Sequence, residues 1–308
     1  MKNTRILFMG TPEFAGFSLK TLIKNEYNVV SVVTKVDAKK DRGQKIKFSP
    51  VKEIAIENSI PVFQPENLKA ENFSDYLTEI NPDLIIVVAY GKILPEYVID
   101  YPKYGCINIH ASLLPKYRGS APIQYAVKCG EKVSGITTML IGKGLVDTGD
   151  ILLKKEILIT KEDTGGSLHD KLMEISGDIL IETIENIETI TPEKQDDSLA
   201  TYAPMIKKDD TIIDFNEDAI DIINKIRGFY PFPTTSFEMN DKFYKIHKAE
   251  LYSSDYTGES GKIIEFSKDK LLIGAKNGII NILEIQPPNK KCMSIKDFYN
   301  GALPRRLK

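Results

Sequence analysis

The sequence predicts an α/β protein in which a mostly parallel, doubly wound sheet is followed by a small open β-barrel. In the first half, short apolar runs alternate with helical apolar patterns, as in parallel sheets whose connections are helices. Around residues 189–199 the apolar periodicity stops, and short strand-like runs follow at close spacing. The 308 residues are about twice the ~150 of an ordinary domain. We therefore expect two domains, 1–190 and 204–308, joined by a linker over 191–203.

The first domain is expected to begin with a strand over residues 5–9, which ends at Gly10 and leads into a helix. Further strands are expected at 29–33, 84–89, 106–110 and 151–153, and helices at 51–57, 73–80 and 167–187. The strand runs lack polar alternation, which is typical of parallel strands buried on both faces. Helices are therefore expected on both faces of the sheet.

The second domain is expected to open with a helix over 218–228, followed by the stiff segment 230–233 with its two prolines. Short strands are expected after it at 235–239, 244–251, 261–266, 271–275 and 278–285. Strands this short and this closely spaced are typical of a small barrel.

Composition excludes several classes of protein. Hydrophobic residues make up 42% and charged residues 27%, which excludes wholesale disorder. The net charge of −2 argues against a general nucleic-acid coat. Cys106, Cys129 and Cys292 lie far apart, so neither a disulfide framework nor a zinc site is expected. Apolar runs are far shorter than the ~20 residues of a membrane span, and no secretory signal is expected. A cytoplasmic protein fits best.

The densest group of chemically capable residues lies at 105–115. Strand alternation places Asn108 and His110 on one face near the carboxyl end of a strand, where open α/β sheets bind ligands. An amide donor beside an imidazole suits the stabilisation and protonation of an oxyanion in acyl transfer. A histidine held by a backbone carbonyl explains this pair alone equally well.

A glycine-flanked stretch at 142–150 supplies the carboxylates Asp147 and Asp150. Asp147 could orient His110 or accept a proton from an amine, and Asp150 could cap a turn before the next strand. Either aspartate could instead be a turn residue only.

A basic stretch at 35–47 carries six lysines and arginines against two aspartates. Such a loop is either a solvated surface or a functional one, and the charge count alone leaves both open.

Asn108-Ile-His110, the Ser-Leu-Leu-Pro run at 112–115 and Asp147-Thr-Gly-Asp150 resemble the signature of enzymes that use 10-formyltetrahydrofolate. Matches at 8–15, 49–52, 89–91, 116–122 and 226–233 make the chain similar to the methionyl-tRNA formyltransferases over nearly its whole length. The resemblance implies a Rossmann-like first domain and an OB-like second domain. One departure is Met205, where that family usually has a lysine, so the effect of Met205 on tRNA contacts stays open.

The resemblance also implies an activity and a site. The formyl group of the co-substrate 10-formyltetrahydrofolate would pass to the α-amino group of methionine on initiator methionyl-tRNA, for translation initiation. Asn108 and His110 would stabilise the oxyanion, and Asp147 would help to remove the amine proton and hold His110. The folate donor would contact Val88, Ala89, Tyr90, Gly91, Ser112, Leu113, Leu114 and Pro115.

The tRNA acceptor stem would meet Arg42, with Lys39, Lys40 and Lys45 beside it. No metal and no membrane are expected, and the protein is expected to be a monomer. Ile93, Leu94 and Val98 could form an apolar wall for the pterin or could simply pack in the core.

Two rival functions remain. Asn108, His110 and Asp147, together called the triad, also fit a 10-formyltetrahydrofolate hydrolase or an amino-sugar N-formyltransferase. The basic loop together with a second domain favours tRNA as substrate. A non-catalytic RNA-binding module has no need for Asn108, His110 and Asp147 together.

Overall fold

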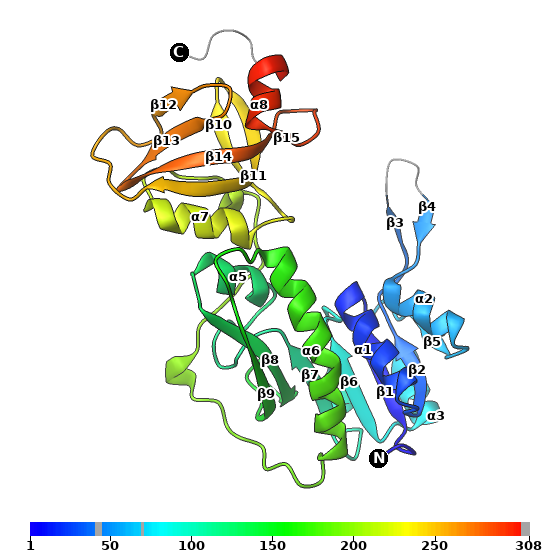
Figure 1. Ribbon diagram of the computed structural model, residues 1–308. Coiled ribbons are helices and arrows are strands. Elements are labelled where there is room, and N and C mark those ends of the chain that lie inside the picture. The colour runs from blue at the N-terminus through cyan, green and yellow to red at the C-terminus, as the bar shows by residue number, and fades with distance from the viewer. Residues whose placement is uncertain (41–44, 69–70, 303–308) are drawn as a thin grey trace. The chain divides into compact units, whose positions relative to one another are not determined.

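The computed structural model describes residues 1–40, 45–68 and 71–302, and Figure 1 shows the arrangement of their elements. The chain forms two compact units, each assembled from separate stretches. The first unit takes Met1–Gly119, Gly135–Ile157 and Asp170–Tyr202, and the second takes Ser120–Ser134, Leu158–His169 and the chain from Ala203 onward. The predicted domain bounds, 1–190 and 204–308, and the linker stay a prediction.

The sheet of the first unit has seven strands in the order β5-β2-β1-β6-β7-β8-β9. Their bounds are β1 Ile6–Gly10, β2 Val29–Val33, β5 Val62–Phe63, β6 Leu84–Val88, β7 Cys106–His110, β8 Val133–Leu140 and β9 Ile151–Leu158. The pairs β5–β2, β2–β1, β1–β6 and β6–β7 are parallel, and β8 runs antiparallel to β7. The prediction of a mostly parallel sheet is confirmed.

Helices cover both faces of this sheet. They are α1 (Glu13–Lys24), α2 (Pro50–Glu57), α3 (Glu71–Ile80), the short α4 (Glu96–Ile99) and the long α6 (Gly165–Glu185). Leu7 and Met9 of β1 share an apolar cluster with Phe73 and Leu77 of α3. On the opposite face, Thr138 of β8 hydrogen-bonds Thr183 of α6. Neighbouring strand residues point to opposite faces, so this sheet needs helices on both sides.

Local sequence explains where several elements begin. The Ser49 hydroxyl accepts a hydrogen bond from the backbone N–H of Lys52 and so caps α2, and Pro50 occupies the first helical turn. The central parallel strands β1 and β6 contain no polar side chain and are completely buried.

Several elements before residue 160 were not predicted, among them the short β5 and α4. Strand β8 carries Ser134, Thr137 and Thr138, whose burial depends on hydrogen bonds rather than on an apolar pattern. The basic stretch contains a hairpin of β3 (Ala38–Lys40) and β4 (Lys45–Lys47) where only a loop was expected. Helix α5 (Pro122–Lys128) is short and was overlooked.

The second unit is built on an antiparallel sheet in the order β10-β11-β14-β13-β12, with β15 paired to β14. The strands are β10 Thr235–Met239, β11 Lys242–Ser253, β12 Ile263–Phe266, β13 Leu271–Ala275, β14 Gly278–Gln286 and β15 Met293–Ser294. Register shifts interrupt the β11–β14 and β12–β13 pairs, which increases the local bending of a sheet. The five predicted strands are confirmed, with small shifts of their ends.

Helices α7 (Ala219–Gly228) and α8 (Ile295–Asp297) belong to the second unit, as does α5. Ile222 and Ile226 of α7 are buried in one apolar cluster with Ile246 and Ile282 of the sheet. Helix α7 also packs closely on α5, because a Cβ at Gly228 would lie 2.8 Å from the backbone oxygen of Gln124. Glycine at 228 is therefore required by the helix contact.

Candidate active site

The carboxyl ends of β1, β6 and β7 meet at one edge of the first unit's sheet. Gly10 of β1 is in register with Val88 of β6, and Val87 of β6 is in register with Asn108 of β7. The strands are parallel, so the chain leaves all three at the same edge. Open α/β sheets place their ligands at such an edge.

Asn108, His110 and Asp147 come together there. The distance from His110 Nδ1 to Asp147 Oδ2 is 3.6 Å. The Asn108 amide nitrogen donates to Asp147 Oδ1 across 3.4 Å. His110 and Asp147 are 6% and 9% exposed. The structure thus gathers three residues that the sequence separates by up to 39 positions around one carboxylate.

The other ring nitrogen of His110 faces a backbone carbonyl. His110 Nε2 lies 2.9 Å from the oxygen of Tyr117. A carbonyl oxygen only accepts hydrogen bonds, so Nε2 must carry the proton in this arrangement. In the neutral ring, Nδ1 then presents its lone pair toward Asp147. A ring protonated at both nitrogens could donate to Tyr117 and to Asp147 together.

The Asp147 carboxylate is held by main-chain geometry. The backbone N–H of Gly119 donates to Asp147 Oδ2 at 2.8 Å. Asp147 itself has a φ of +59°, a left-handed conformation that aspartate tolerates better than most residues. Gly149 follows two residues later, where an added Cβ would lie 1.6 Å from the oxygen of Leu140. The tight connection between β8 and β9 therefore depends on glycine at 149.

The predicted folate-binding segment 88–91 leaves β6 in an unusual conformation. Ala89 has a φ of +46° and Gly91 a φ of +75°. Val88 is fully buried, whereas Ala89 and Gly91 are exposed. Tyr90 is 1% exposed and packs in the core. Only the backbone and small side chains of this turn are therefore open to a ligand.

The predicted apolar wall for the pterin, Ile93, Leu94 and Val98, also contains both buried and exposed residues. Leu94 and Val98 lie in the core cluster, whereas the Ile93 side chain is 79% exposed. Leu145 and Val146, just before Asp147, are also exposed. Core packing thus accounts for Leu94 and Val98.

Residues 112–115, also predicted to contact folate, form a turn held by β8. The Thr137 hydroxyl donates to the oxygen of Ser112 and accepts from the backbone N–H of Leu114. Ser112 and Leu114 are each 1% exposed, and Leu113 and Pro115 are half-buried. This turn leads the chain from His110 toward Tyr117, so it helps to set the position of the carbonyl that faces the imidazole.

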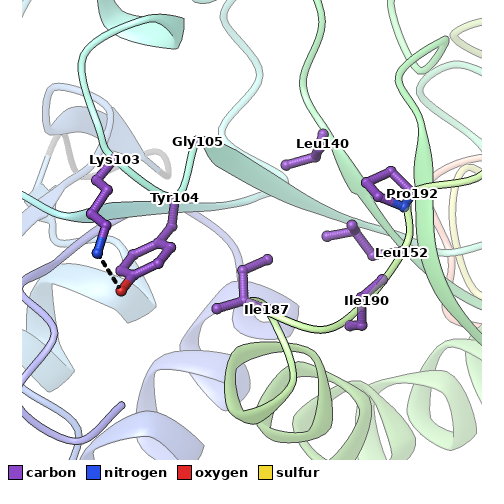
Figure 2. Close-up of a pocket in the computed structure, with 8 residues that line it drawn as sticks. All are labelled: Lys103, Tyr104, Gly105, Leu140, Leu152, Ile187, Ile190 and Pro192. Atoms are coloured by element: carbon purple, nitrogen blue, oxygen red, sulfur yellow. Dashed lines mark hydrogen bonds between the residues drawn. The ribbon is translucent and has the colours of Figure 1, made fainter.

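A cavity of about 330 Å³ lies elsewhere in the first unit. Figure 2 shows its wall of Leu140, Leu152, Ile187, Ile190 and Pro192, with Lys103 and Tyr104 at one side. Gly105, another lining residue, directly precedes β7, whereas His110 ends that strand. Five residues of strand separate them by roughly 17 Å. The cavity therefore belongs to the opposite edge of the sheet from the triad.

The predicted tRNA contacts are only partly within the described residues. Lys39 and Lys40 lie in β3, and Lys45 lies in β4. Arg42 lies outside the described residues.

Sequence reasoning missed the residues that support the triad. Tyr117 and Gly119 act through their backbone, which no side-chain pattern reveals. Arg118 was noted only as part of a motif, and it is 2% exposed. Gln195 lies in the segment predicted as a linker, and nothing in its neighbourhood signalled a role.

Within the stretches that the structure describes, no helix is long and apolar enough to cross a bilayer. Over the same stretches, no group of three or more histidine, cysteine, aspartate or glutamate side chains is arranged to hold a metal ion.

Comparison with known proteins places this fold in a class of formyl-transfer enzymes. The family model described as "Formyl transferase" matches residues 3–184, and that described as "Formyl transferase, C-terminal domain" matches residues 205–303. A solved N-formyltransferase from Helicobacter canadensis has a TM-score of 0.69 at 22% identity, covering 92% of this chain and 99% of that chain. That likeness shows the fold.

Curated relatives specify which formyl transferases the chain resembles. The chain is 47% identical to the methionyl-tRNA formyltransferase of Caldanaerobacter subterraneus subsp. tengcongensis and 48% identical to that of Clostridium perfringens, strain 13. Each match spans 96% of this chain and 96% of the relative. The chain belongs to the formyl transferase family, among the methionyl-tRNA formyltransferases.

Proposed function

We propose that the protein transfers the formyl group of 10-formyltetrahydrofolate to the α-amino group of methionine on initiator methionyl-tRNA. The observation that carries the proposal is the convergence of Asn108 and His110 on the Asp147 carboxylate at the carboxyl edge of the sheet. Near-full-length similarity to methionyl-tRNA formyltransferases supports the choice of acceptor.

The reaction requires the residues of this site to stabilise a developing negative charge and to take up a proton. The neutral amine attacks the formyl carbon, the carbonyl oxygen becomes an oxyanion, and the amine nitrogen must lose a proton. The bond from the formyl carbon to N10 of the folate then breaks, and N10 leaves with a proton as tetrahydrofolate is released. We propose that Asn108 donates to the oxyanion, that His110 donates its Nε2–H to the oxyanion in place of the Tyr117 carbonyl, and that Asp147 accepts the amine proton.

The geometry suits this division of roles. Asp147 is largely buried, so its charge acts in a medium less polarisable than water. The Gly119 N–H fixes one of its oxygens. The Tyr117 carbonyl fixes the tautomer and the plane of His110. Both side chains are therefore held before the substrates arrive, which is the condition for electrostatic stabilisation of a transition state.

The folate donor is proposed to bind beside the triad, against the turn at 88–91 and the loop before Asp147. The left-handed Ala89 and Gly91 expose backbone groups there, and Ile93 and Leu145 offer exposed apolar surface. The N-formyltransferase of Helicobacter canadensis was solved in complex with folinic acid, which is a formylated folate. We propose that the protein acts as a monomer in the cytoplasm without a metal ion. The tRNA contact is proposed to involve Arg42, Lys39, Lys40 and Lys45.

The deciding experiment offers the protein 10-formyltetrahydrofolate with one of three acceptors: charged initiator tRNA, uncharged tRNA or a nucleotide-linked amino sugar. A fourth reaction contains no acceptor. Formyl should appear on charged tRNA alone. Formylation of the sugar would make the protein a sugar N-formyltransferase, and release of formate without an acceptor would make it a hydrolase.

A further inference from the structure

We propose that Gln195 is a positioning residue of the formyl-transfer site, because its amide joins the two backbone turns that hold His110 and Asp147. Gln195 lies after α6, in the segment 193–202, which returns along the first unit. The proposal rests on the proposed function, since the groups it positions are the triad residues.

The nitrogen of the Gln195 amide donates hydrogen bonds to the loop that carries Asp147. Gln195 Nε2 donates to the backbone oxygen of Asp147 at 2.9 Å and to that of Gly149 at 2.7 Å. The two hydrogens of one amide thus satisfy two carbonyls of the tight β8–β9 connection. Asp147 sits between these anchors in its left-handed conformation.

The oxygen of the Gln195 amide accepts hydrogen bonds from Arg118. Arg118 donates to Gln195 Oε1 from Nε at 3.0 Å and from Nη2 at 2.8 Å. A guanidinium only donates, so it also decides which end of the Gln195 amide faces the carbonyls. Arg118 is 2% exposed, and bonds to a charged donor in such surroundings are stronger than ordinary ones.

Arg118 stands between the two groups that support the triad. Its predecessor Tyr117 offers the carbonyl to His110 Nε2, and its successor Gly119 donates to Asp147 Oδ2. The Arg118–Gln195 contact therefore links both supports of His110 to the loop of Asp147. It acts beside the direct hydrogen bond from Gly119 to Asp147 and a second bond from Arg118 to Asp197 Oδ1 at 2.8 Å, and it adds an anchor at the backbone of the Asp147 loop.

The backbone of the 193–202 segment reinforces the same connection. Glu193 forms a β-bridge with Ile151, just after the Asp147 loop. Thr201 accepts from the backbone N–H of Tyr117 through its hydroxyl and from that of Arg118 through its carbonyl. Gln195 lies between these attachments, so its side chain is aligned before it closes the network.

The test compares Gln195→Met with Lys194→Met. Methionine keeps the length and volume of glutamine but removes the acceptor and both donors. Lys194 is an exposed neighbour in the same segment, so its replacement controls for an added methionine. Gln195→Glu is the second variant, because it keeps the acceptor for Arg118 while placing an oxygen where the two carbonyls need a donor.

Two readouts separate positioning from general stability. In the full chain, kcat for charged tRNA should fall roughly 10-fold or more in both Gln195 variants, as expected for a small displacement of reacting groups, while the KM for 10-formyltetrahydrofolate stays within about 3-fold. The protein has three histidines, so ¹⁵N-histidine spectra without substrate resolve His110. Its ring-nitrogen shifts should move in Gln195→Met and Gln195→Glu and stay in place in Lys194→Met.

Unchanged His110 shifts in both Gln195 variants would overturn the proposal, even if activity fell. Wild-type kcat in both would overturn it as well. Because the spectra need no substrate, they remain decisive if charged tRNA proves not to be the acceptor, and that failure would concern the proposed function alone.

Discussion

Asp147 Oδ2 lies 3.6 Å from His110 Nδ1, and both side chains are almost completely covered. This separation is longer than a hydrogen bond. A ring that also carries a proton on Nδ1 would attract the carboxylate, and the distance could then shorten when substrate binds. Tightening of such contacts in the reacting complex is common in enzymes.

Loss of either side chain should affect chemistry more than folding. We expect His110→Ala and Asp147→Asn each to lower turnover by at least ~100-fold, the range for removal of a general acid or base, and Asn108→Ala to behave alike. Single-turnover formylation measures the loss, and thermal melting serves as its control. Normal turnover in a variant would remove that residue from the mechanism, and a collapsed melting transition would mark its role as structural.

Gly91 should be needed for the shape of the folate-binding turn. Gly91→Ala places a Cβ at a φ of +75°, at a cost of about 1–2 kcal/mol, and should weaken binding of a stable folate analogue measured by calorimetry. Ala89→Gly is the matched variant, since it relieves a φ of +46° and should change binding little. Equal affinity for wild type and Gly91→Ala would exclude this turn from the donor site.

We expect Tyr90 to lower the free energy of unfolding of the protein in alkaline solution. Its hydroxyl is buried and has no hydrogen-bond partner among the described residues, and burial raises the pKa of Tyr90 to about 12. The unfolded chain releases this proton near pH ~10, so the stability contributed by the protonated form is complete below pH ~10 and is lost as the pH rises toward 12.

Tyr90→Phe should therefore match or exceed wild type in its urea midpoint at pH 8 and lose less stability between pH 10 and 11.5. Tyr27→Phe is the contrasting variant, because the Tyr27 hydroxyl donates to Glu185 at 3.3 Å and its removal should cost about 1 kcal/mol. A midpoint for Tyr90→Phe well below wild type at pH 8 would mean that the hydroxyl has a partner in solution.

Gly228 should be intolerant of even one added carbon. In Gly228→Ala the new Cβ meets the oxygen of Gln124 and the nitrogen of Lys128 at 2.8 and 2.9 Å. Both atoms belong to the backbone of α5, so the helices must separate, at a cost of about 1–3 kcal/mol. Gly144→Ala, where nothing lies within 4 Å, should leave the melting temperature nearly unchanged. A Gly228→Ala protein as stable as wild type would contradict the close helix contact.

Arg42 provides the prediction that separates a tRNA substrate from a sugar. Arg42→Ala should raise the KM for charged tRNA or reduce its turnover and leave folate affinity alone. Each lost phosphate contact should reduce the slope of log affinity against log salt by roughly 0.7–0.9, so the defect should shrink as ionic strength rises. Lys24→Ala, exposed at the last turn of α1, is the control. An unchanged tRNA KM and salt slope would make the basic stretch a solvated surface.

Many strands and helices of the first unit were predicted correctly, because buried elements show a pattern of apolar residues over a few neighbouring positions. Strands β2 and β7 match their predicted bounds, since apolar residues dominate β2 and alternate with Asn108 and His110 in β7. The two-residue alternation that places Asn108 and His110 on one face is likewise a local property. Strand β8 escaped prediction because its buried threonines are satisfied by hydrogen bonds to Ser112, Leu114 and Thr183, which no window of sequence around β8 contains.

The sequence by itself determined the fold class and the order of most elements, because periodicity is a property of neighbouring positions. It also predicted candidate residues for formyl transfer through their motifs. Only the tertiary structure decided how those residues are held. The contact between Arg118 and Gln195 joins positions 77 residues apart, and the hydrogen bond from Gly119 to Asp147 spans 28. Such bonds depend on where the whole sheet brings its loops, so they leave no pattern along the chain.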